Sequence, residues 1–301
     1  MSNMTATAHM SQHLPDHANT PVCLVTGCST GFGRSLANHL LSRSYRTVVS
    51  ARDISQIADF AKYPSALLLQ LDVTEQAQVD AAVATTMARF GRIDYLINNA
   101  GIGYFAAVEE SEAAQVRRMF EVNFFGASRM IQAVLPSMRE KRSGFIVNIS
   151  SIGGLCAFPA LGYYNASKFA LEGLSEALWQ EVEPLGIQVM LVEPSGFRTD
   201  WAGRSAADST RQIADYAASA GACRQHLRAI SGLQAGDPER AAQVIVHAME
   251  ARHPPHRLLL GADAVQAAMQ KLEVMREEFS KWQAVARSAD LPPETTASSS
   301  L

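Results

Sequence analysis

The chain has 301 residues, of which 48% are hydrophobic, and its formal net charge is −3. This length and apolar content suffice for one large buried core. A nucleic-acid partner would require a basic surface, so the near-neutral charge argues against one, and no apolar run approaches the roughly 20 residues that a membrane-spanning helix needs.

The two ends of the chain differ from its middle in composition. Residues 1–20 are rich in Ser, Thr, His and Asn and lack a basic segment followed by an apolar run, which predicts a disordered tail rather than a signal peptide. A Pro-, Thr- and Ser-rich stretch predicts a flexible C-terminal tail over 286–301. The four cysteines show no metal-site or CxxC spacing, so we expect reduced thiols, a cytoplasmic protein and no bound metal.

Strand-like and helix-like segments alternate along the chain between these ends. Most strand candidates are short, continuous apolar runs, which are typical of strands covered on both faces. They are Val22–Thr26, Thr47–Ala51, Ala66–Asp72, Asp94–Asn98, Gly144–Ser150, Ile187–Glu193 and Arg257–Leu260. Helical patterns lie between them at Gln76–Arg89, Glu112–Arg139, Lys168–Val182 and Pro238–Ala251. Asp237 followed by Pro238 is a good start signal for the last helix.

This alternation predicts a single α/β domain over 21–285. We expect a Rossmann-type doubly wound sheet of about seven parallel strands with helices on both faces. The segment 197–236 breaks the alternation just after a strand end. Because ligands bind at the carboxyl ends of parallel strands, this segment is a candidate substrate lid.

Three glycines, Gly27, Gly31 and Gly33, follow the first predicted strand and begin the first predicted helix. A tight turn, a close approach to a pyrophosphate and close helix packing each favour a residue without Cβ. The N–H groups at the helix N-terminus attract phosphate. A simple tight turn would also explain such a cluster, but its place after the first strand favours a dinucleotide site.

Tyr164 and Lys168 are four residues apart and share a face if the segment is helical. A tyrosine hydroxyl with its ordinary pKa near 10 is a poor base at neutral pH, and a nearby ammonium favours the phenolate. Tyr163 has Ser167 at the same spacing instead. The pattern therefore favours Tyr164 as a proton donor and acceptor.

Two serines close the fifth predicted strand, in the sequence Asn148-Ile149-Ser150-Ser151. The Ser151 hydroxyl can donate to a substrate oxygen on which negative charge develops. Strand alternation is expected to direct Ser150 to the other face.

The turn Thr26–Gly33, Ser151 and the Tyr-x-x-x-Lys pair thirteen residues later together resemble the short-chain dehydrogenase/reductase family. The resemblance covers about residues 21–262 and extends to Asn98-Asn99-Ala100-Gly101. It implies hydride transfer between a nicotinamide dinucleotide and an alcohol or carbonyl group. The catalytic set that it implies is Asn123, Ser151, Tyr164 and Lys168, with Asn123 supporting a proton relay.

The family resemblance also implies a set of cofactor contacts. It gives Asp72 a contact to adenine and Thr199 one to the carboxamide of nicotinamide. The family usually has Pro-Gly adjacent, whereas here Ser195 intervenes. The implied contacts are Gly27, Ser29, Thr30, Gly31, Phe32, Gly33, Arg34, Arg52, Asp72, Val73, Asn99, Ala100, Gly101, Tyr164, Lys168, Pro194, Gly196 and Thr199.

The end of the second strand bears on the choice between NAD and NADP. An acid there would accept hydrogen bonds from the ribose 2′-hydroxyl and repel a 2′-phosphate. The family spacing places Ala51 at this position, with Arg52 next and Asp53 one place too late. A guanidinium can bind phosphate, and Arg34 could supply a second one. We therefore expect NADP rather than NAD.

The combined signals predict an NADP(H)-dependent oxidoreductase acting on an apolar alcohol or carbonyl compound. The glycine turn resembles that of the 17β-hydroxysteroid and retinol dehydrogenase branch. A nucleotide-sensing protein without turnover and a sugar-nucleotide epimerase are the alternatives. The family mostly assembles through its long helices, so we expect a homodimer or homotetramer. The candidate pocket residues are Ile152, Leu155, Phe158, Leu161, Phe197 and Trp201.

Overall fold

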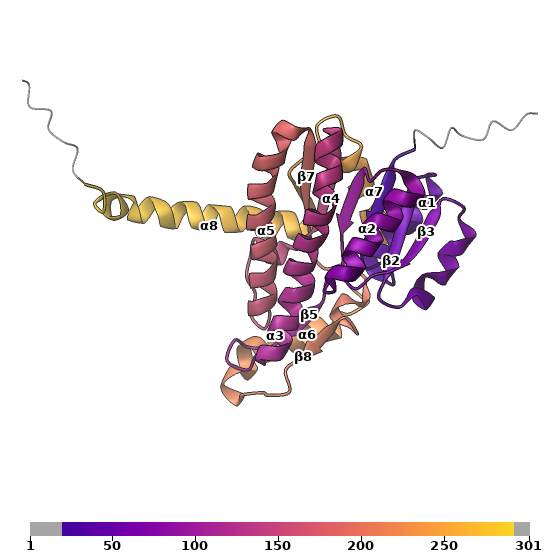
Figure 1. Ribbon diagram of the computed structural model, residues 1–301. Coiled ribbons are helices and arrows are strands. Elements are labelled where there is room, and N and C mark those ends of the chain that lie inside the picture. The colour runs from indigo at the N-terminus through magenta and orange to yellow at the C-terminus, as the bar shows by residue number, and fades with distance from the viewer. Residues whose placement is uncertain (1–19, 292–301) are drawn as a thin grey trace, which may run out of the picture.

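The computed structural model describes residues 20–291 (Figure 1). Residues 1–19 of the tail predicted over 1–20, and residues 292–301 of the tail predicted over 286–301, lie outside the described residues. A seven-stranded parallel sheet with the strand order β3-β2-β1-β4-β6-β7-β9 forms the centre. Its strands are β1 (Val22–Val25), β2 (Arg46–Ala51), β3 (Ala66–Gln70), β4 (Tyr95–Asn98), β6 (Gly144–Ile149), β7 (Ile187–Pro194) and β9 (Arg257–Leu260).

Helices cover both faces of this sheet, so the predicted doubly wound α/β fold is confirmed (Figure 1). One face carries α1 (Gly31–Ser42), the 3₁₀ segment η1 (Ile54–Lys62) and α7 (Pro238–Met249). The other carries α2 (Gln76–Phe90), α4 (Ala127–Lys141) and α5 (Gly162–Val182).

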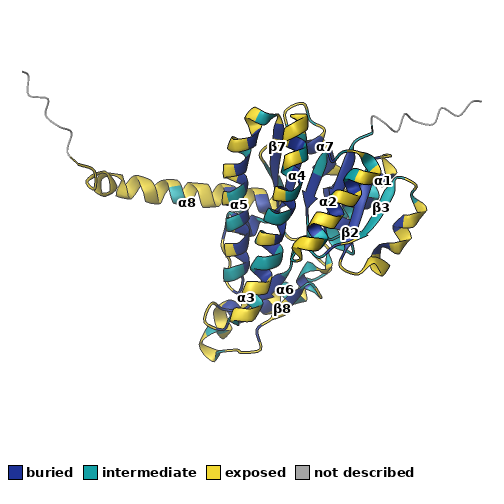
Figure 2. Ribbon diagram, viewed as in Figure 1, coloured by how far each residue is buried: buried dark blue, intermediate teal, exposed yellow. Residues whose placement is uncertain are grey.

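The strands have few polar residues because neighbouring positions pack into different cores. In β1, Cys23 and Val25 join the core under α1 and α7, while Leu24 joins the core under α2, α4 and α5. In β2, Val49 joins the first of these cores and Val48 joins the second. Figure 2 shows the sheet buried between its helices. The continuous apolar runs thus follow from burial on both faces.

Two helix boundaries differ from those predicted. The segment predicted as one helix over 112–139 is divided into α3 (Ala113–Phe120), a π-helical turn η2 (Glu121–Gly126) and α4. The helix predicted from Lys168 begins six residues earlier, at Gly162. Glycine, tyrosine and asparagine in this first stretch are poor helix formers, but burial of Tyr164 and Asn165 outweighs that preference.

The segment 197–236 is more regular than predicted. It contains β8 (Ala206–Asp208), which pairs in parallel with β5 (Gly103–Phe105), and α6 (Ala222–Ala229). These elements and α3 lie together beyond the carboxyl edge of the large sheet (Figure 1). Pairing between segments about 100 residues apart leaves no local pattern that the sequence analysis could use.

The helix α8 (Ala262–Arg287) was not predicted, although it is the longest helix of the described residues. It begins against the domain and then extends away from it (Figure 1). Figure 2 shows most of its length exposed. Within residues 20–291, no helix combines the length and apolar character needed to cross a membrane.

Candidate active site

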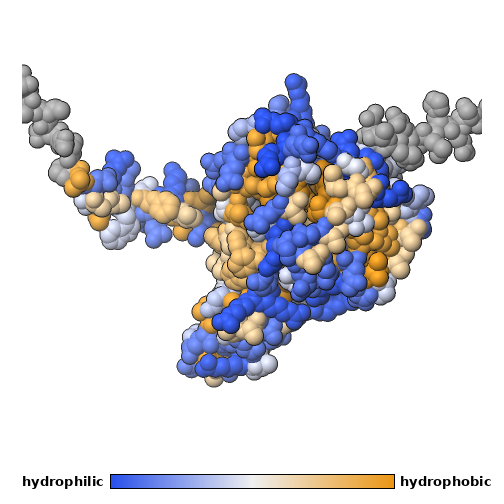
Figure 3. Space-filling model, in the orientation of Figure 1, coloured by the Kyte–Doolittle hydropathy of each residue, from blue (hydrophilic) through white to orange (hydrophobic). Residues whose placement is uncertain are grey.

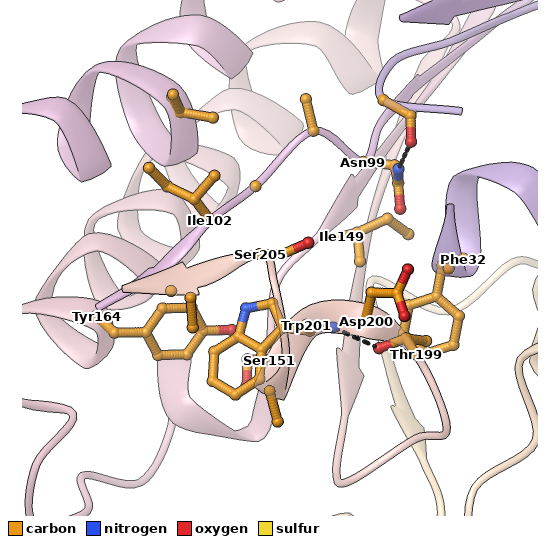
Figure 4. A pocket seen from close by; sticks show the side chains of 18 of the residues that line it. Phe32, Asn99, Ile102, Ile149, Ser151, Tyr164, Thr199, Asp200, Trp201 and Ser205 are labelled. Carbon is orange, nitrogen blue, oxygen red and sulfur yellow. Dashed lines mark hydrogen bonds between the residues drawn. The ribbon is translucent and has the colours of Figure 1, made fainter. Parts of the chain in front are cut away.

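A cavity of about 720 Å³ runs along the carboxyl edge of the sheet. It is lined from the glycine turn after β1, past the ends of β2, β3, β4, β6 and β7, to the segment with β8 and α6. The chain order of the strands reverses between β1 and β4. Such a reversal is where open α/β sheets bind ligands, and Figure 4 shows the side chains that converge there.

The glycine turn forms one end of this cavity. Gly27 and Gly31 have φ angles of 71° and 56°, and residues other than glycine rarely adopt this left-handed backbone conformation. Both line the cavity, together with Ser29, Thr30 and Phe32.

Gly33 has a different role because it does not line the cavity. A Cβ on Gly33 would overlap with Asn99 Nδ2 and with the carbonyl oxygen of Gly27. Gly33 therefore allows α1 to lie close to the turn and to β4. The cofactor contact expected from Gly33 stays a prediction.

The end of β2 presents Ala51 and Arg52 to the cavity and no carboxylate. Asp53 instead caps η1, where its Oδ1 accepts the Ser55 N–H at 3.0 Å. The absence of an acid at this strand end therefore agrees with the sequence analysis.

The structure does not bring Arg34 into the cavity. Its Nη2 donates to Asp59 Oδ2 at 2.6 Å, its Nη1 donates to the carbonyl of Gln56, and its guanidinium lies 5.0 Å from the centre of the Phe60 ring. The ion pair and the ring hold Arg34 against η1. This arrangement does not favour the second phosphate contact expected from Arg34, which stays a prediction.

The ends of β3 and β4 follow the predicted motifs. Asp72 and Val73 line the cavity, and Asp72 Oδ1 accepts the Thr74 N–H at 3.0 Å. Asn99 Nδ2 donates to the carbonyls of Thr26 at 2.9 Å and Gly27 at 3.0 Å, which ties β4 to the glycine turn. Asn99, Ala100 and Gly101 all line the cavity.

Asn123 lies in the π-helical turn and is fully enclosed. Its Oδ1 accepts the Ile102 N–H at 2.8 Å, and its Nδ2 donates to the Ile102 carbonyl at 3.0 Å and to Ser167 Oγ at 3.2 Å. It does not line the cavity. Asn123 thus fixes the chain after β4 and the helix α5 relative to each other, and it does so from a π-helical turn, a feature that is frequent at functional sites.

We expect Asn123→Ala to lower the free energy of unfolding by about 2–4 kcal/mol, because both backbone groups of Ile102 lose a buried partner. Chemical denaturation measures this change. Ser167→Ala is the matched control: it removes the Ser167 bonds to Asn123 and to the Tyr164 carbonyl but leaves both Ile102 bonds in place, and it should cost clearly less. Equal losses in the two variants would contradict the role assigned to Asn123.

The proposed catalytic side chains meet in the middle of the cavity, which Ser151, Tyr164 and Lys168 all line. Ser151 Oγ accepts the Gly153 N–H at 2.9 Å. Lys168 Nζ lies 5.9 Å from the centre of the Tyr164 ring and donates to the Ile149 carbonyl at 2.9 Å. Figure 4 shows Tyr164 and Ser151 directed to the same region.

Of the two rival residues, Ser150 also lines the cavity. Ser150 Oγ has no hydrogen-bond partner among the described residues and lies beside Gly154, where a Cβ would come within 2.8 Å of it. Tyr163 packs in the apolar cluster around Phe105 and does not line the cavity.

Burial dominates the acid–base properties of this group. Burial raises the pKa of Tyr164 to about 12, although the interaction with the Ser151 hydroxyl acts in the opposite direction and lowers it. Burial also lowers the pKa of Lys168 to about 8, although the nearby carboxylate of Glu172 acts in the opposite direction and raises it. The pKa of Tyr164 in this structure is therefore set mainly by burial, and not by the lysine as the sequence suggested.

The segment after β7 contributes Pro194, Gly196 and Thr199 to the cavity lining. The additional Ser195 donates through Oγ to the Leu260 carbonyl at 3.2 Å and so attaches the segment to β9. Thr199 Oγ1 accepts the Trp201 N–H at 3.3 Å (Figure 4). The inserted serine thus leaves the neighbouring positions at the cavity.

The far end of the cavity is largely apolar. Of the candidate pocket residues, Ile152, Phe158, Leu161, Phe197 and Trp201 line it. The Trp201 ring lies 4.8 Å from that of Tyr164. Leu155 does not line the cavity; it packs instead against the start of α8.

Several lining residues were missed by the sequence analysis. They come from β5, α3, β8, α6 and the residues next to these elements, which reach the cavity through the tertiary fold and not through a local motif. They include Ile102, Tyr104, Gln115, Arg118, Ser205, Ala206, Cys223, His226, Leu227, Ile230 and Gln234.

Comparison with known proteins agrees with this geometry. Residues 21–210 match the protein family described as short chain dehydrogenase. The chain is 37% identical over 270 residues to Oxidoreductase BOA17 of Botryotinia fuckeliana, across 87% of this chain and 97% of that protein. It is 37% identical over 246 residues to the 3-ketodihydrosphingosine reductase of Bacteroides thetaiotaomicron, across 80% and 87%.

Three solved structures illustrate the similarity in fold. A short-chain dehydrogenase from Streptomyces avermitilis is 41% identical with a TM-score of 0.85, over 90% of this chain and 99% of that one. A Burkholderia phymatum short chain dehydrogenase/reductase in complex with NAD is 25% identical, with a TM-score of 0.76 over 89% and 96%. ElxO with NADP bound is 25% identical, with a TM-score of 0.68 over 82% and 99%.

Proposed function

This chain belongs to the short-chain dehydrogenase family, and on that premise we propose that it is an NADP(H)-dependent oxidoreductase with Tyr164 as its proton donor and acceptor. The observation that carries the proposal is one continuous cavity lined both by the glycine turn and by Ser151, Tyr164 and Lys168. A dinucleotide in this cavity supplies the hydride. The protein supplies the proton and the stabilisation of charge.

The glycine turn fits such a dinucleotide. A Cβ on Gly31 would lie 3.3 Å from Thr199 Cβ and narrow the passage between the turn and the segment after β7. The N-terminus of α1 directs backbone N–H groups to this region, where they can bind phosphate. Ser29 and Thr30 add hydroxyl groups beside them.

In the reductive direction, Tyr164 donates its hydroxyl proton to the substrate oxygen. Burial favours the protonated form of Tyr164 at neutral pH, which suits a proton donor. The Ser151 hydroxyl donates a hydrogen bond to the same oxygen as charge develops on it. The ammonium of Lys168 favours the phenolate that remains, and Asn123 acts by positioning the surrounding chain.

We expect reductive turnover to be constant below about pH 8 and to fall above it. The lowered pKa of Lys168 means that the ammonium is present below about 8 and is lost as the pH rises through that value. The measurement is kcat for carbonyl reduction against pH. Lys168→Arg is the control, because a guanidinium stays charged in this range. A wild-type profile that stays level well above pH 8 would contradict the role of Lys168.

The preference for NADP rests on the end of β2. Arg52 lines the cavity next to Ala51, and no carboxylate occupies this strand end to repel a 2′-phosphate. Both NAD and NADP occur in the related structures, so cofactor preference in this chain depends on its own residues at β2.

The substrate that we propose is an apolar ketone, aldehyde or alcohol. Ile152, Leu161 and Trp201 form an apolar wall beside Tyr164. One relative is named as the reductase of a 3-keto compound, 3-ketodihydrosphingosine. Steroid- and retinoid-like compounds, suggested by the branch resemblance, belong to the same apolar class.

We further propose that the domain spans 21–285, that 197–236 acts as a substrate lid, and that the protein is a cytoplasmic homo-oligomer. Residues of 197–236 form one wall of the cavity. All four cysteines are free, which suits a reducing compartment. Phe125, between α3 and α4, and Phe169 on α5 are exposed apolar residues on the helices expected to form subunit contacts.

A further inference from the structure

The helix α8 carries an apolar stripe that its own domain leaves uncovered. Only its first turns pack on the domain, where Ala264 and Ala268 contact the cluster that contains Ile152 and Cys156. Beyond Ala268, every residue of α8 is exposed except Met275, which is partly exposed. The exposed fractions of the large apolar side chains are 62% for Met269, 62% for Leu272, 64% for Phe279 and 62% for Trp282. Figure 3 shows apolar side chains along this projecting helix.

The stripe has the spacing of a coiled coil. Its apolar residues follow one another at alternating intervals of three and four, which places them on one side of the helix. They are Val265, Ala268, Leu272, Met275, Phe279, Trp282 and Ala286. A regular stripe of this kind fits a second helix better than it fits an irregular surface.

We propose that α8 pairs antiparallel with α8 of a second copy of this chain. In the pairing that we infer, Leu272 faces Met275 of the second copy and Val265 faces its Trp282. Ala268 is covered by its own domain, so at this end the contact with the second copy is made by Val265, which is 47% exposed. At 1.5 Å per residue, the paired segment 265–282 is about 26 Å long.

Charges beside the stripe select this pairing. Lys271 and Glu278 flank it on the same side, and neither forms an ion pair among the described residues. In the antiparallel arrangement, Lys271 of each copy meets Glu278 of the other, so two attractive pairs form. A parallel pair would bring Lys271 near Arg276. An antiparallel pair shifted by one heptad would bring the Glu278 side chains of the two copies together, or their two Lys271 side chains. Both shifts would place like charges side by side.

The helix itself favours a second copy over a lipid surface. Helices that lie on membranes are typically rich in Lys and Arg on their polar face. The segment Ala262–Arg287 has four basic and four acidic residues, so its net charge is zero. The C-terminal stretch 292–301 contains only one large aliphatic residue, Leu301, and so could not cover the stripe.

The first test is the mass of the full-length protein by sedimentation equilibrium. The double variant Leu272→Glu with Phe279→Glu should raise the dissociation constant of one assembly step by about 100-fold or more, because charge replaces two buried apolar contacts. Val274→Glu is the matched control, since Val274 is 53% exposed on the opposite side of α8 and should leave the mass unchanged. A monomeric wild type, or a double variant with the wild-type mass, would overturn the proposal.

The second test addresses the pairing itself. Lys271→Glu and Glu278→Lys should each raise the dissociation constant by roughly tenfold at low salt, because each puts like charges together at two places. The variant with both substitutions should recover the wild-type value, since the pairs are then attractive again. Failure of the double variant to recover would refute the antiparallel arrangement.

A third measurement separates the membrane alternative. Flotation with vesicles of phosphatidylcholine and phosphatidylserine should show no binding of the wild type. Binding that the double variant Leu272→Glu with Phe279→Glu abolishes would overturn the proposal in favour of a lipid surface. None of these variants touches the cavity, so NADPH affinity serves as a check that each variant is folded.

Discussion

Replacement of Tyr164 by phenylalanine is expected to lower the rate of carbonyl reduction by about 10²–10⁴-fold, the usual contribution of a positioned acid or base. The substitution removes one hydroxyl from the middle of the cavity and leaves the ring, which contacts Trp201 at 4.8 Å. Because the glycine turn is untouched, the affinity for NADPH should change little. Steady-state kinetics and a binding titration measure the two effects separately.

Tyr163→Phe is the matched control for this variant. It makes the same chemical change at the neighbouring residue, which packs around Phe105 and does not line the cavity. It should retain nearly the wild-type rate. Equal losses in the two variants would point to a general effect on the fold, and full activity of Tyr164→Phe would refute the proposed proton donor.

A substitution at the end of β2 is expected to change the preference of the protein for NADPH over NADH. Ala51→Asp should weaken NADPH binding by roughly 10- to 100-fold, because its carboxylate would repel the 2′-phosphate. The same carboxylate can accept hydrogen bonds from the ribose of NADH, so NADH affinity should be retained or improved. Titration of both nucleotides into the wild type and the variant measures the shift.

Three further variants make this result specific. Ala51→Asn has nearly the size of Asp without the charge and should retain most of the preference for NADPH. Arg52→Ala should weaken NADPH by about tenfold through the loss of one guanidinium–phosphate contact. Arg34→Ala should change it little, because Arg34 is held by Asp59. A larger loss from Arg34→Ala than from Arg52→Ala would reverse the assignment.

The sheet could be predicted from sequence because each strand is buried on both faces and therefore reads as a short apolar run. The glycine turn and the order of the motifs then indicated which edge of the sheet holds the site. Strand alternation favours Ser151 over Ser150, but both serines line the cavity, so this choice stays a prediction. Local sequence signals were therefore enough to predict the sheet and the edge at which the candidate site lies.

Other features could not be predicted because they depend on distant partners. Arg34 follows the glycine turn as a phosphate ligand might, but Asp59 and Phe60 of η1 hold it elsewhere. The pairing of β5 with β8 joins segments about 100 residues apart. The early start of α5 contradicts helix propensity because burial of Tyr164 fixes it there.

The most direct test of the central claim follows the loss of NADPH absorbance in the near ultraviolet with a panel of apolar aldehydes, ketones, retinal and keto-steroids. Wild-type protein and Tyr164→Phe are compared side by side, with NADH as a second cofactor. The account predicts turnover with NADPH that the variant loses while it still binds the cofactor. Turnover that survives in Tyr164→Phe, or NADPH binding without turnover of any compound, would contradict it, and the second result would favour a nucleotide sensor.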